Sequence, residues 1–184
     1  MNVKNIIKSS AKLLELYEVI EYMESSEKDD ILDAEINALL LSTNMAISNV
    51  ASNYINVCEK KKMEAKDGVI KLSDISGNPI IQIKKILRNN APIKFKVHTD
   101  IIELENGICE VVFSYFPPSV NLEDNISYFP QLNELLFSYA VVSEYLFLKG
   151  QVDDAYMWDK RFKASLLSIQ RPCRNIILPK KRWW

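Results

Sequence analysis

The chain has 184 residues, of which 48% are apolar and 26% charged, and its formal net charge is −1. This length and composition predict one globular domain, or one domain with a substantial insertion, and exclude a chain that needs disulfides to hold a core. No apolar run approaches the ~20 residues that span a membrane, so we expect no membrane contact. Residues 1–8 carry no signal-peptide segment, and Cys58, Cys109 and Cys173 are odd in number and widely spaced, so we expect a cytoplasmic protein with reduced thiols.

The charges are unevenly distributed along the chain. Residues 15–35 hold many carboxylates and a single cation, Lys28, whereas residues 160–184 hold cations and no acid. One interpretation is that both segments are ordinary solvated faces. The other is that an acidic surface and a basic tail bind different partners, or bind each other across a subunit boundary.

Two helical segments are predicted in the first third of the chain. Apolar residues follow a helical period over residues 3–23, either continuously or with a break, and Asp29 or Asp30 can cap the next helix. That helix is expected to run to Cys58, and its side opposite the apolar face is uncharged and polar, being formed by Ser42, Asn44, Ser48, Asn49, Ser52, Asn53 and Asn56. This polar side is either a surface that packs on another protein or the solvent face of a modestly soluble helix.

Residues 67–116 are expected to form an antiparallel β module of about five strands. Short runs rich in Ile and Val alternate with turn signals, and Asn106-Gly107 between two such runs predicts a hairpin. The order of helices, strands and helices predicts an α+β fold. We expect a helical body of residues 1–59 and 129–172, an inserted β module within residues 60–128, and an extended C-terminal docking tail of residues 173–184.

The last third of the chain predicts two helices. The first, over residues 132–148, is apolar on nearly every side and is therefore expected to be buried on every side. Gly150 supplies the left-handed residue that commonly ends a helix. Trp158 lies on the apolar face of the second helix, so we expect it in the core against residues 136–145, before Pro172 stops the helix.

The sequence carries no catalytic or metal-binding motif. It has one histidine, His98, and it has no Cys-x-x-Cys pair, no His-x-x-x-His pair and no glycine-rich phosphate loop. Glu144 is the one carboxylate inside the apolar helix, and this favours an internal ion pair, with Arg161 of the following helix, over a catalytic role. We therefore expect no enzyme activity, no cofactor and no metal.

The end of the chain combines cations with two indoles, in the order Lys180, Lys181, Arg182, Trp183, Trp184. Indoles are large apolar surfaces and frequent anchors of protein interfaces, so we expect this segment to dock on a partner. Cations beside aromatic rings also fit nucleic acid, whose phosphates and bases they can contact. The sequence leaves both kinds of partner open.

Several motifs along the chain form one pattern. A β insertion begins near Gly68-Val69-Ile70-Lys71-Leu72-Ser73-Asp74, after N-terminal helices and before a returning helical pair. The pattern is sharpest in Ser138-Tyr139-Ala140, Ser143-Glu144-Tyr145, Gly150, Asp154-Ala155, Trp158, Arg161-Phe162, Ala164 with Leu166, and Lys181-Arg182-Trp183-Trp184. With its Glu-Tyr helix, glycine, Trp helix and basic-aromatic terminus, the whole chain resembles the head–tail adaptor (connector) proteins of tailed bacteriophages and prophages, particularly those of Gram-positive hosts.

This resemblance implies a structural virion protein and not an enzyme. Such a protein forms a ring, commonly of twelve subunits, below the portal in the virion neck, and is assembled in the cytoplasm of the bacterial host. The implied partners are the portal protein, which residues 180–184 would grip, neighbouring copies, other neck or tail proteins, and DNA that passes through the lumen without sequence-specific binding. The alternative is a small cytoplasmic nucleic-acid-binding or regulatory module that uses the basic tail.

Overall fold

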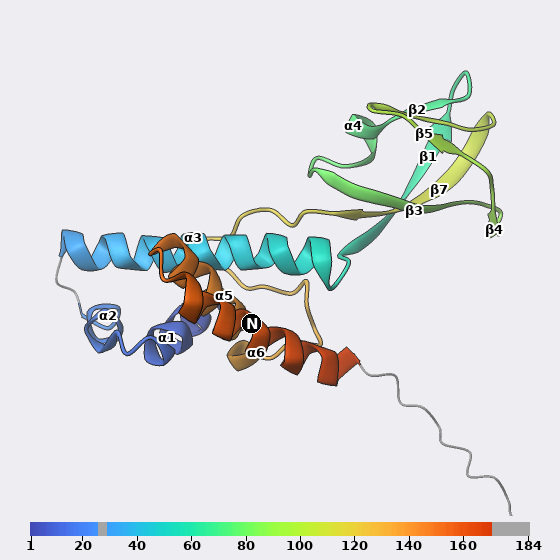
Figure 1. Ribbon diagram of the computed structural model, residues 1–184. Coiled ribbons are helices and arrows are strands. Elements are labelled where there is room, and N and C mark those ends of the chain that lie inside the picture. The colour runs from blue at the N-terminus through green and yellow to red at the C-terminus, as the bar shows by residue number, and fades with distance from the viewer. Residues whose placement is uncertain (26–28, 171–184) are drawn as a thin grey trace, which may run out of the picture.

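The computed structural model of the protein describes residues 1–25 and 29–170, which form a helical body and a β module at one end of its longest helix (Figure 1). This arrangement confirms the predicted α+β class. The predicted docking tail, with Lys180, Lys181, Arg182, Trp183 and Trp184, lies outside the described residues.

The N-terminal segment is two helices with a break between them. Helix α1 spans Val3–Leu13 and helix α2 spans Tyr17–Tyr22. Between them Glu15 adopts a φ of +60°, a left-handed conformation that an α-helix cannot continue through. The chain therefore turns here, and α2 packs beside α1 and the next helix.

Helix α3 spans Asp30–Asn53, and Asp29 caps it. The Asp29 Oδ1 atom accepts hydrogen bonds from the backbone N–H groups of Ile31 and Leu32, at 2.8 and 3.3 Å. The prediction that this helix continues to Cys58 is wrong, because Cys58 is the first residue of strand β1. That strand is held by pairing with a strand about 50 residues away, a partner that local periodicity does not reveal.

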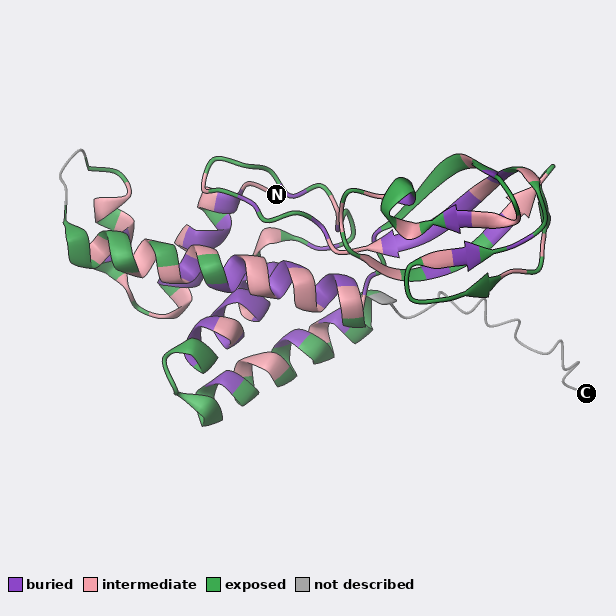
Figure 2. Cartoon of the chain, turned by 90° about the horizontal axis from the view of Figure 1, so that it is seen from above, coloured by how far each residue is buried: buried purple, intermediate pink, exposed green. Residues whose placement is uncertain are grey.

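Helices α5, Glu134–Leu148, and α6, Val152–Gln170, form an antiparallel pair. Gly150 has a φ of +76°, and the N–H groups of Gly150 and Gln151 bond to the carbonyls of Phe147 and Leu146 at 3.1 and 2.9 Å. This is the Schellman arrangement that ends a helix at a left-handed glycine. Helix α5 contacts α1, α3 and α6, so it is buried on most sides (Figure 2).

The β module consists of two small antiparallel sheets that share one core. One sheet has the strand order β1-β7-β3-β4 and the other has the order β2-β6-β5. The elements are β1 Cys58–Ala65, β2 Val69–Lys71, the single turn α4 Leu72–Ile75, β3 Ile80–Arg88, β4 Ala91–Pro92, β5 Lys96–Val97, β6 Ile101–Glu103 and β7 Gly107–Tyr115. Their shared core contains Ala65, Ile70, Ile75, Ile83, Ile86, Ile102, Leu104, Cys109, Val111 and Phe113.

The predicted hairpin at Asn106-Gly107 does not form, because β6 and β7 belong to different sheets. The Asn106 side chain instead accepts a hydrogen bond from the backbone N–H of Gly68. A tight hairpin is found at Asn89 and Asn90, whose φ angles of +51° and +64° suit the two-residue turn between β3 and β4. Both dipeptides favour turns, and the long-range pairing decides which of them joins neighbouring strands.

The segment from β7 to α5, residues 116–133, crosses back over the helical body and is here called the return segment. Four of its apolar side chains lie in the core of the helical body: Val120, Ile126, Phe129 and Leu132. Its backbone also pairs with the N-terminus, since Met1 and Ile126 exchange hydrogen bonds of 2.8 and 2.7 Å. Much of residues 117–128, predicted within the β insertion, therefore packs on the helices.

Trp158 lies against α5, with its ring centre 5.5 Å from that of Tyr139. The sequence predicted a core residue packed on this helix, and Trp158 does pack there, but it is only partly buried. The Arg161 guanidinium covers part of the same surface, 5.2 Å from the centre of the Trp158 ring. The fully buried positions of α6 are Ala155, Phe162 and Leu166.

Glu35 links α3 to the end of α5. Its carboxylate accepts hydrogen bonds from the hydroxyl of the buried Tyr145 and, at 2.7 Å, from Lys149 Nζ. Partial burial opposes ionisation of Glu35, but the bonds from Lys149 and Tyr145 outweigh it and lower the pKa of the carboxyl below 4.5. Burial and the neighbouring carboxylate raise the pKa of the Tyr145 hydroxyl.

Partial burial of Trp158 sets the expected cost of removing it. Trp158→Ala should lower the free energy of unfolding by about 2 kcal/mol, less than the 3–5 kcal/mol typical of a fully buried tryptophan. Met157→Ala is the matched control, because Met157 is 72% exposed and should change stability by less than about 0.5 kcal/mol. Urea unfolding of both variants measures the difference, and equal midpoints would contradict the packing of Trp158 on α5.

The Glu35 contacts should make stability depend on pH. Because the pKa of Glu35 is lower in the folded state, the unfolded state binds the proton more readily as pH falls. The stabilisation is therefore present above about pH 4.5 and is lost as pH falls below that value. We expect Glu35→Gln to be less stable than the native chain at pH 7, with the gap narrowing towards pH 3 in unfolding curves.

The exposed, neutral change Asn37→Gln on the same helix supplies the baseline for those curves. A gap between Glu35→Gln and the native chain that stays constant from pH 7 to pH 3 would contradict the assigned ionic contact.

Candidate functional site

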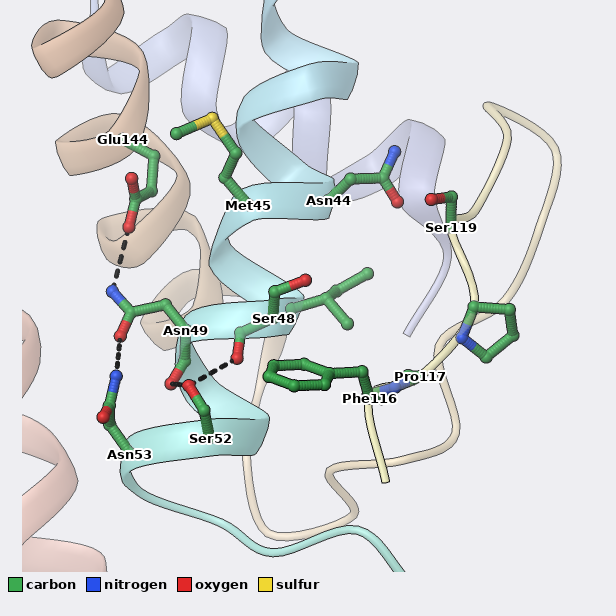
Figure 3. Close-up of a pocket in the computed structure, with 12 residues that line it drawn as sticks. Asn44, Met45, Ser48, Asn49, Ser52, Asn53, Phe116, Pro117, Ser119 and Glu144 are labelled. Carbon is green, nitrogen blue, oxygen red and sulfur yellow. Dashed lines mark hydrogen bonds between the residues drawn. The ribbon is translucent and has the colours of Figure 1, made fainter. Parts of the chain in front are cut away.

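A polar groove runs between α3 and the beginning of the return segment, with a volume of about 480 Å³ (Figure 3). One wall is the uncharged face of α3 that the sequence singled out, and the other is Phe116, Pro117, Pro118 and Ser119. Residues of this face that line the groove are Asn44, Ser48, Asn49, Ser52 and Asn53. Part of the predicted polar face is thus one wall of an open groove between α3 and the return segment.

Asn44 closes one end of the groove by holding the return segment. Its Nδ2 atom donates to the carbonyl of Val120 at 3.1 Å, and its Oδ1 atom accepts from the Val120 N–H at 2.7 Å. The amide therefore matches both backbone groups of a buried residue. Ser42, from the same predicted face, is itself buried and donates to the Ala38 carbonyl, so it does not reach the groove.

A chain of hydrogen bonds borders the groove on the side of α5. Asn49 Nδ2 donates to Glu144 Oε1 at 2.9 Å, and Asn53 Nδ2 donates to Asn49 Oδ1 at 2.8 Å (Figure 3). The predicted ion pair of Glu144 with Arg161 is therefore wrong. Glu144 faces α3, whereas Arg161 lies on the opposite side of α5, 4.7 Å from the centre of the Tyr139 ring.

The chemistry of this groove is that of hydrogen bonding. Its polar lining consists of amides, hydroxyls and one carboxylate, with the apolar Phe116 and two prolines opposite. Amides and hydroxyls both donate and accept hydrogen bonds, so this lining suits a polypeptide backbone or a polar protein surface. Among the described residues no group of three His, Cys, Asp or Glu side chains is placed to hold a metal ion.

The other residues that the sequence singled out are scattered. His98 is exposed in the β module, with Nε2 3.3 Å from Glu103 Oε2, and it does not line the groove. Cys58 is exposed, while burial raises the pKa of the Cys109 thiol. No helix in the described part of the chain is long and apolar enough to cross a membrane.

Sequence reasoning missed two surfaces that carry exposed apolar side chains. On α6, Val152, Tyr156 and Leu167 are exposed on one face, here called the outer face, which neighbours the face of the buried Ala155, Phe162 and Leu166. Beside α2 there is a groove that includes the exposed Tyr17 and Ile31. The sequence does show a second apolar row at helical spacing on this helix. The apolar face that contains Trp158 has more apolar residues, and the prediction followed that face.

Comparison with models of known protein families finds no match to this chain, and comparison with curated proteins finds no significant match. The resemblance to head–tail adaptors thus stays a prediction from the sequence pattern.

Asn44 should matter for stability because it satisfies two backbone groups of the return segment. Asn44→Ala should lower the free energy of unfolding by about 1–3 kcal/mol, since it leaves the buried Val120 N–H and C=O without their partner. Asn53→Ala, an exposed change in the same groove, should cost less than about 0.5 kcal/mol. Urea unfolding gives both values, and similar losses in the two variants would show that Asn44 does not anchor the segment.

Proposed function

We propose that this protein is a head–tail adaptor of a tailed bacteriophage, a structural virion protein without enzymatic activity. In this proposal it forms a ring below the portal, in the neck of the virion, and DNA passes through the ring without sequence-specific contacts. Its partners are the portal protein, neighbouring copies of itself and other neck or tail proteins. It is assembled in the host cytoplasm, and Lys180, Lys181, Arg182, Trp183 and Trp184 grip the portal.

One observation carries most of the support, namely the division of the chain into a closed helical body and a module that projects from the end of α3 (Figure 1). The two parts have separate cores, and the partly buried Tyr115 packs against both. A ring subunit needs one surface for its neighbours and others for the structures above and below it. A body with a projecting module supplies such separate surfaces.

The charge distribution gives further support. Glu15, Glu18, Glu21 and Asp30 are exposed at the N-terminal end of the helical body, while Lys160, Arg161 and Lys163 are exposed on α6. Closed rings are built from heterologous contacts, in which two different surfaces of the subunit meet. Acidic and basic surfaces on separate parts of one subunit suit such contacts.

The second candidate is a small nucleic-acid-binding or regulatory module. It is favoured by one observation, that the exposed cations of α6 precede a basic segment in the sequence. Salt separates the two candidates, because phosphate binding weakens steeply as salt rises whereas an interface anchored by indoles weakens less.

Removing residues 179–184 tests the proposed portal contact. We expect the truncated protein to keep its melting temperature, because the described fold lies entirely before this segment, and to lose stable attachment to the portal oligomer. Attachment is measured by co-sedimentation with purified portal at 0.1 and 0.5 M salt. Losing one anchor residue typically costs about 2 kcal/mol or more, which is roughly a thirtyfold loss of affinity.

Two further variants separate the indoles from the charges. Trp183→Ala with Trp184→Ala should weaken portal attachment at both salt concentrations, whereas Lys180→Ala with Lys181→Ala should act mainly at low salt. Normal portal affinity of the truncated protein would refute the tail as the anchor. Loss of DNA binding alone, in a strongly salt-dependent way, would favour the nucleic-acid module.

A further inference from the structure

The outer face of α6 is an exposed row that mixes apolar and basic side chains. It consists of Val152, Tyr156, Lys160, Lys163 and Leu167, whose spacings place them along one side of the helix. Tyr156 and Leu167 are 61% and 62% exposed. The exposed ring of Phe147 extends the row beyond its first turn, because it contacts Tyr156 edge to face at 5.4 Å.

Large apolar side chains in a continuous exposed row mark an interaction surface more often than an ordinary solvent face. Here the row extends over four turns, with Lys160 and Lys163 between its apolar ends, and the neighbouring face of α6 supplies the helix with its core contacts through Ala155, Phe162 and Leu166. Lys160 has no charged or hydrogen-bonded partner among the described residues, while Lys163 pairs with Asp159 at 2.6 Å. At least one cation in the row is therefore available to a partner.

A second surface, here called the acidic groove, lies between α2 and the first turns of α3 and has a volume of about 450 Å³. Its apolar lining includes Tyr17 and Ile31, which are 61% and 79% exposed. Glu15 and Glu18 stand at its edge, and no cation of the described residues pairs with them. The groove thus combines exposed apolar surface with unpaired carboxylates.

The outer face of α6 and the acidic groove are complementary. Both expose apolar side chains, and their charges are opposite in sign. We propose that the outer face of α6 in one copy of the protein docks into the acidic groove of a second copy. This inference rests on the proposed function, because the contact would join neighbouring subunits of the proposed ring.

The second half of the row cannot reach the acidic groove of the same copy. The groove lies at the first turns of α3, whereas the second half of α6 lies beside the last turns of α3, where Phe162 contacts Tyr54 with ring centres 5.8 Å apart (Figure 1). Helix α3 separates these places by roughly 33 Å, at 1.5 Å per residue. The pairing is therefore heterologous, between different surfaces of two copies, and contacts of this kind generate rings or chains.

A second copy fits the outer face of α6 better than DNA does. Phosphates would use Lys160 and Lys163 but would leave Tyr156 and Leu167 exposed, and the acidic groove of the same molecule would repel a duplex. A helix that inserts an apolar face into a groove, with charges at the rim, is a common mode of protein recognition.

Charge exchange tests the contact in solution and on the portal. Glu18→Lys and Lys160→Glu should each weaken self-association roughly tenfold or more, because like charges then face each other. The double variant, which restores opposite charges, should recover most of the loss. Lys94→Glu, an exposed charge reversal in the β module, is the matched control and should have no effect. Sedimentation over a concentration series, with and without portal, gives the association constants.

A cysteine pair gives a direct readout that does not depend on affinity. In a Cys58→Ser, Cys173→Ser background, Ile31→Cys with Leu167→Cys should give disulfide-linked multimers under mild oxidation, since the distance within one copy is too long for a disulfide. The pair Val97→Cys with Leu167→Cys, also of exposed residues, should give far fewer. Both substitutions replace exposed side chains, so folding is checked simply by the melting temperature.

The outcomes separate this inference from the proposed function. Rings on the portal without Ile31–Leu167 crosslinks, and without rescue by the double charge exchange, would overturn the inference while leaving the adaptor proposal intact. Crosslinked multimers that do not bind portal would support the inference and count against the adaptor. If Lys160→Glu reduces DNA binding and leaves self-association unchanged, the outer face of α6 is a nucleic-acid surface and the inference is wrong.

Discussion

The burial of α5 is the constraint on which the rest of the structure depends. This helix is apolar around most of its circumference, so leaving any side of it in water would expose a large apolar area. It is covered by α1 and α3 from the beginning of the chain and by α6 from the end. Its two buried serines are also satisfied, since Ser138 donates to the Glu134 carbonyl and Ser143 to the Ala155 carbonyl. The two ends of the chain must therefore come together before the body has a core.

This constraint explains why the β module is an insertion. The chain leaves the helical body after α3 and has to come back to begin α5, so β1 and β7 run antiparallel at the junction. The Tyr115 N–H donates to the Val57 carbonyl at 3.1 Å, which keeps the outgoing and returning chains together next to the body. The return segment then crosses the helices, where Asn44 and the N-terminus hold it. The module keeps a core of its own, while Ile81 and Tyr115 beside the junction pack against the core of the helical body.

The same arrangement leaves several surfaces free for partners. The polar groove beside the return segment is already partly used, because Asn44 and Asn49 are bonded within the molecule. On the outer face of α6 and at the acidic groove, by contrast, Lys160, Glu15 and Glu18 have no charged partner among the described residues. In the proposed assembly, the charges on those two surfaces would select the orientation in which subunits meet.

By itself the sequence determined the features that depend on neighbouring residues. Apolar periodicity identified the helices at both ends, the carboxylate of Asp29 marked a helix start, and Gly150 marked a helix end, because caps and periodicity act within one or two turns. The sequence also distinguished the acidic segment, residues 15–35, from the basic segment, residues 160–184, because charge follows directly from residue type. The resemblance to adaptors came from the same local motifs.

Only the tertiary structure decided which distant residues meet. The lysine-rich segment that begins at Cys58 is a strand because β7 pairs with it along its whole length. Asn106-Gly107 does not form a hairpin because the strands on either side of it belong to different sheets.

Side-chain partners were decided in the same way. Glu144 contacts Asn49 and not Arg161 because α5 presents opposite sides to α3 and α6. Trp158 stayed partly exposed because the core beneath α6 was already filled by Phe162 and Leu166. Each of these results depends on how elements far apart in the chain pack together, and sequence spacing carries no record of that geometry.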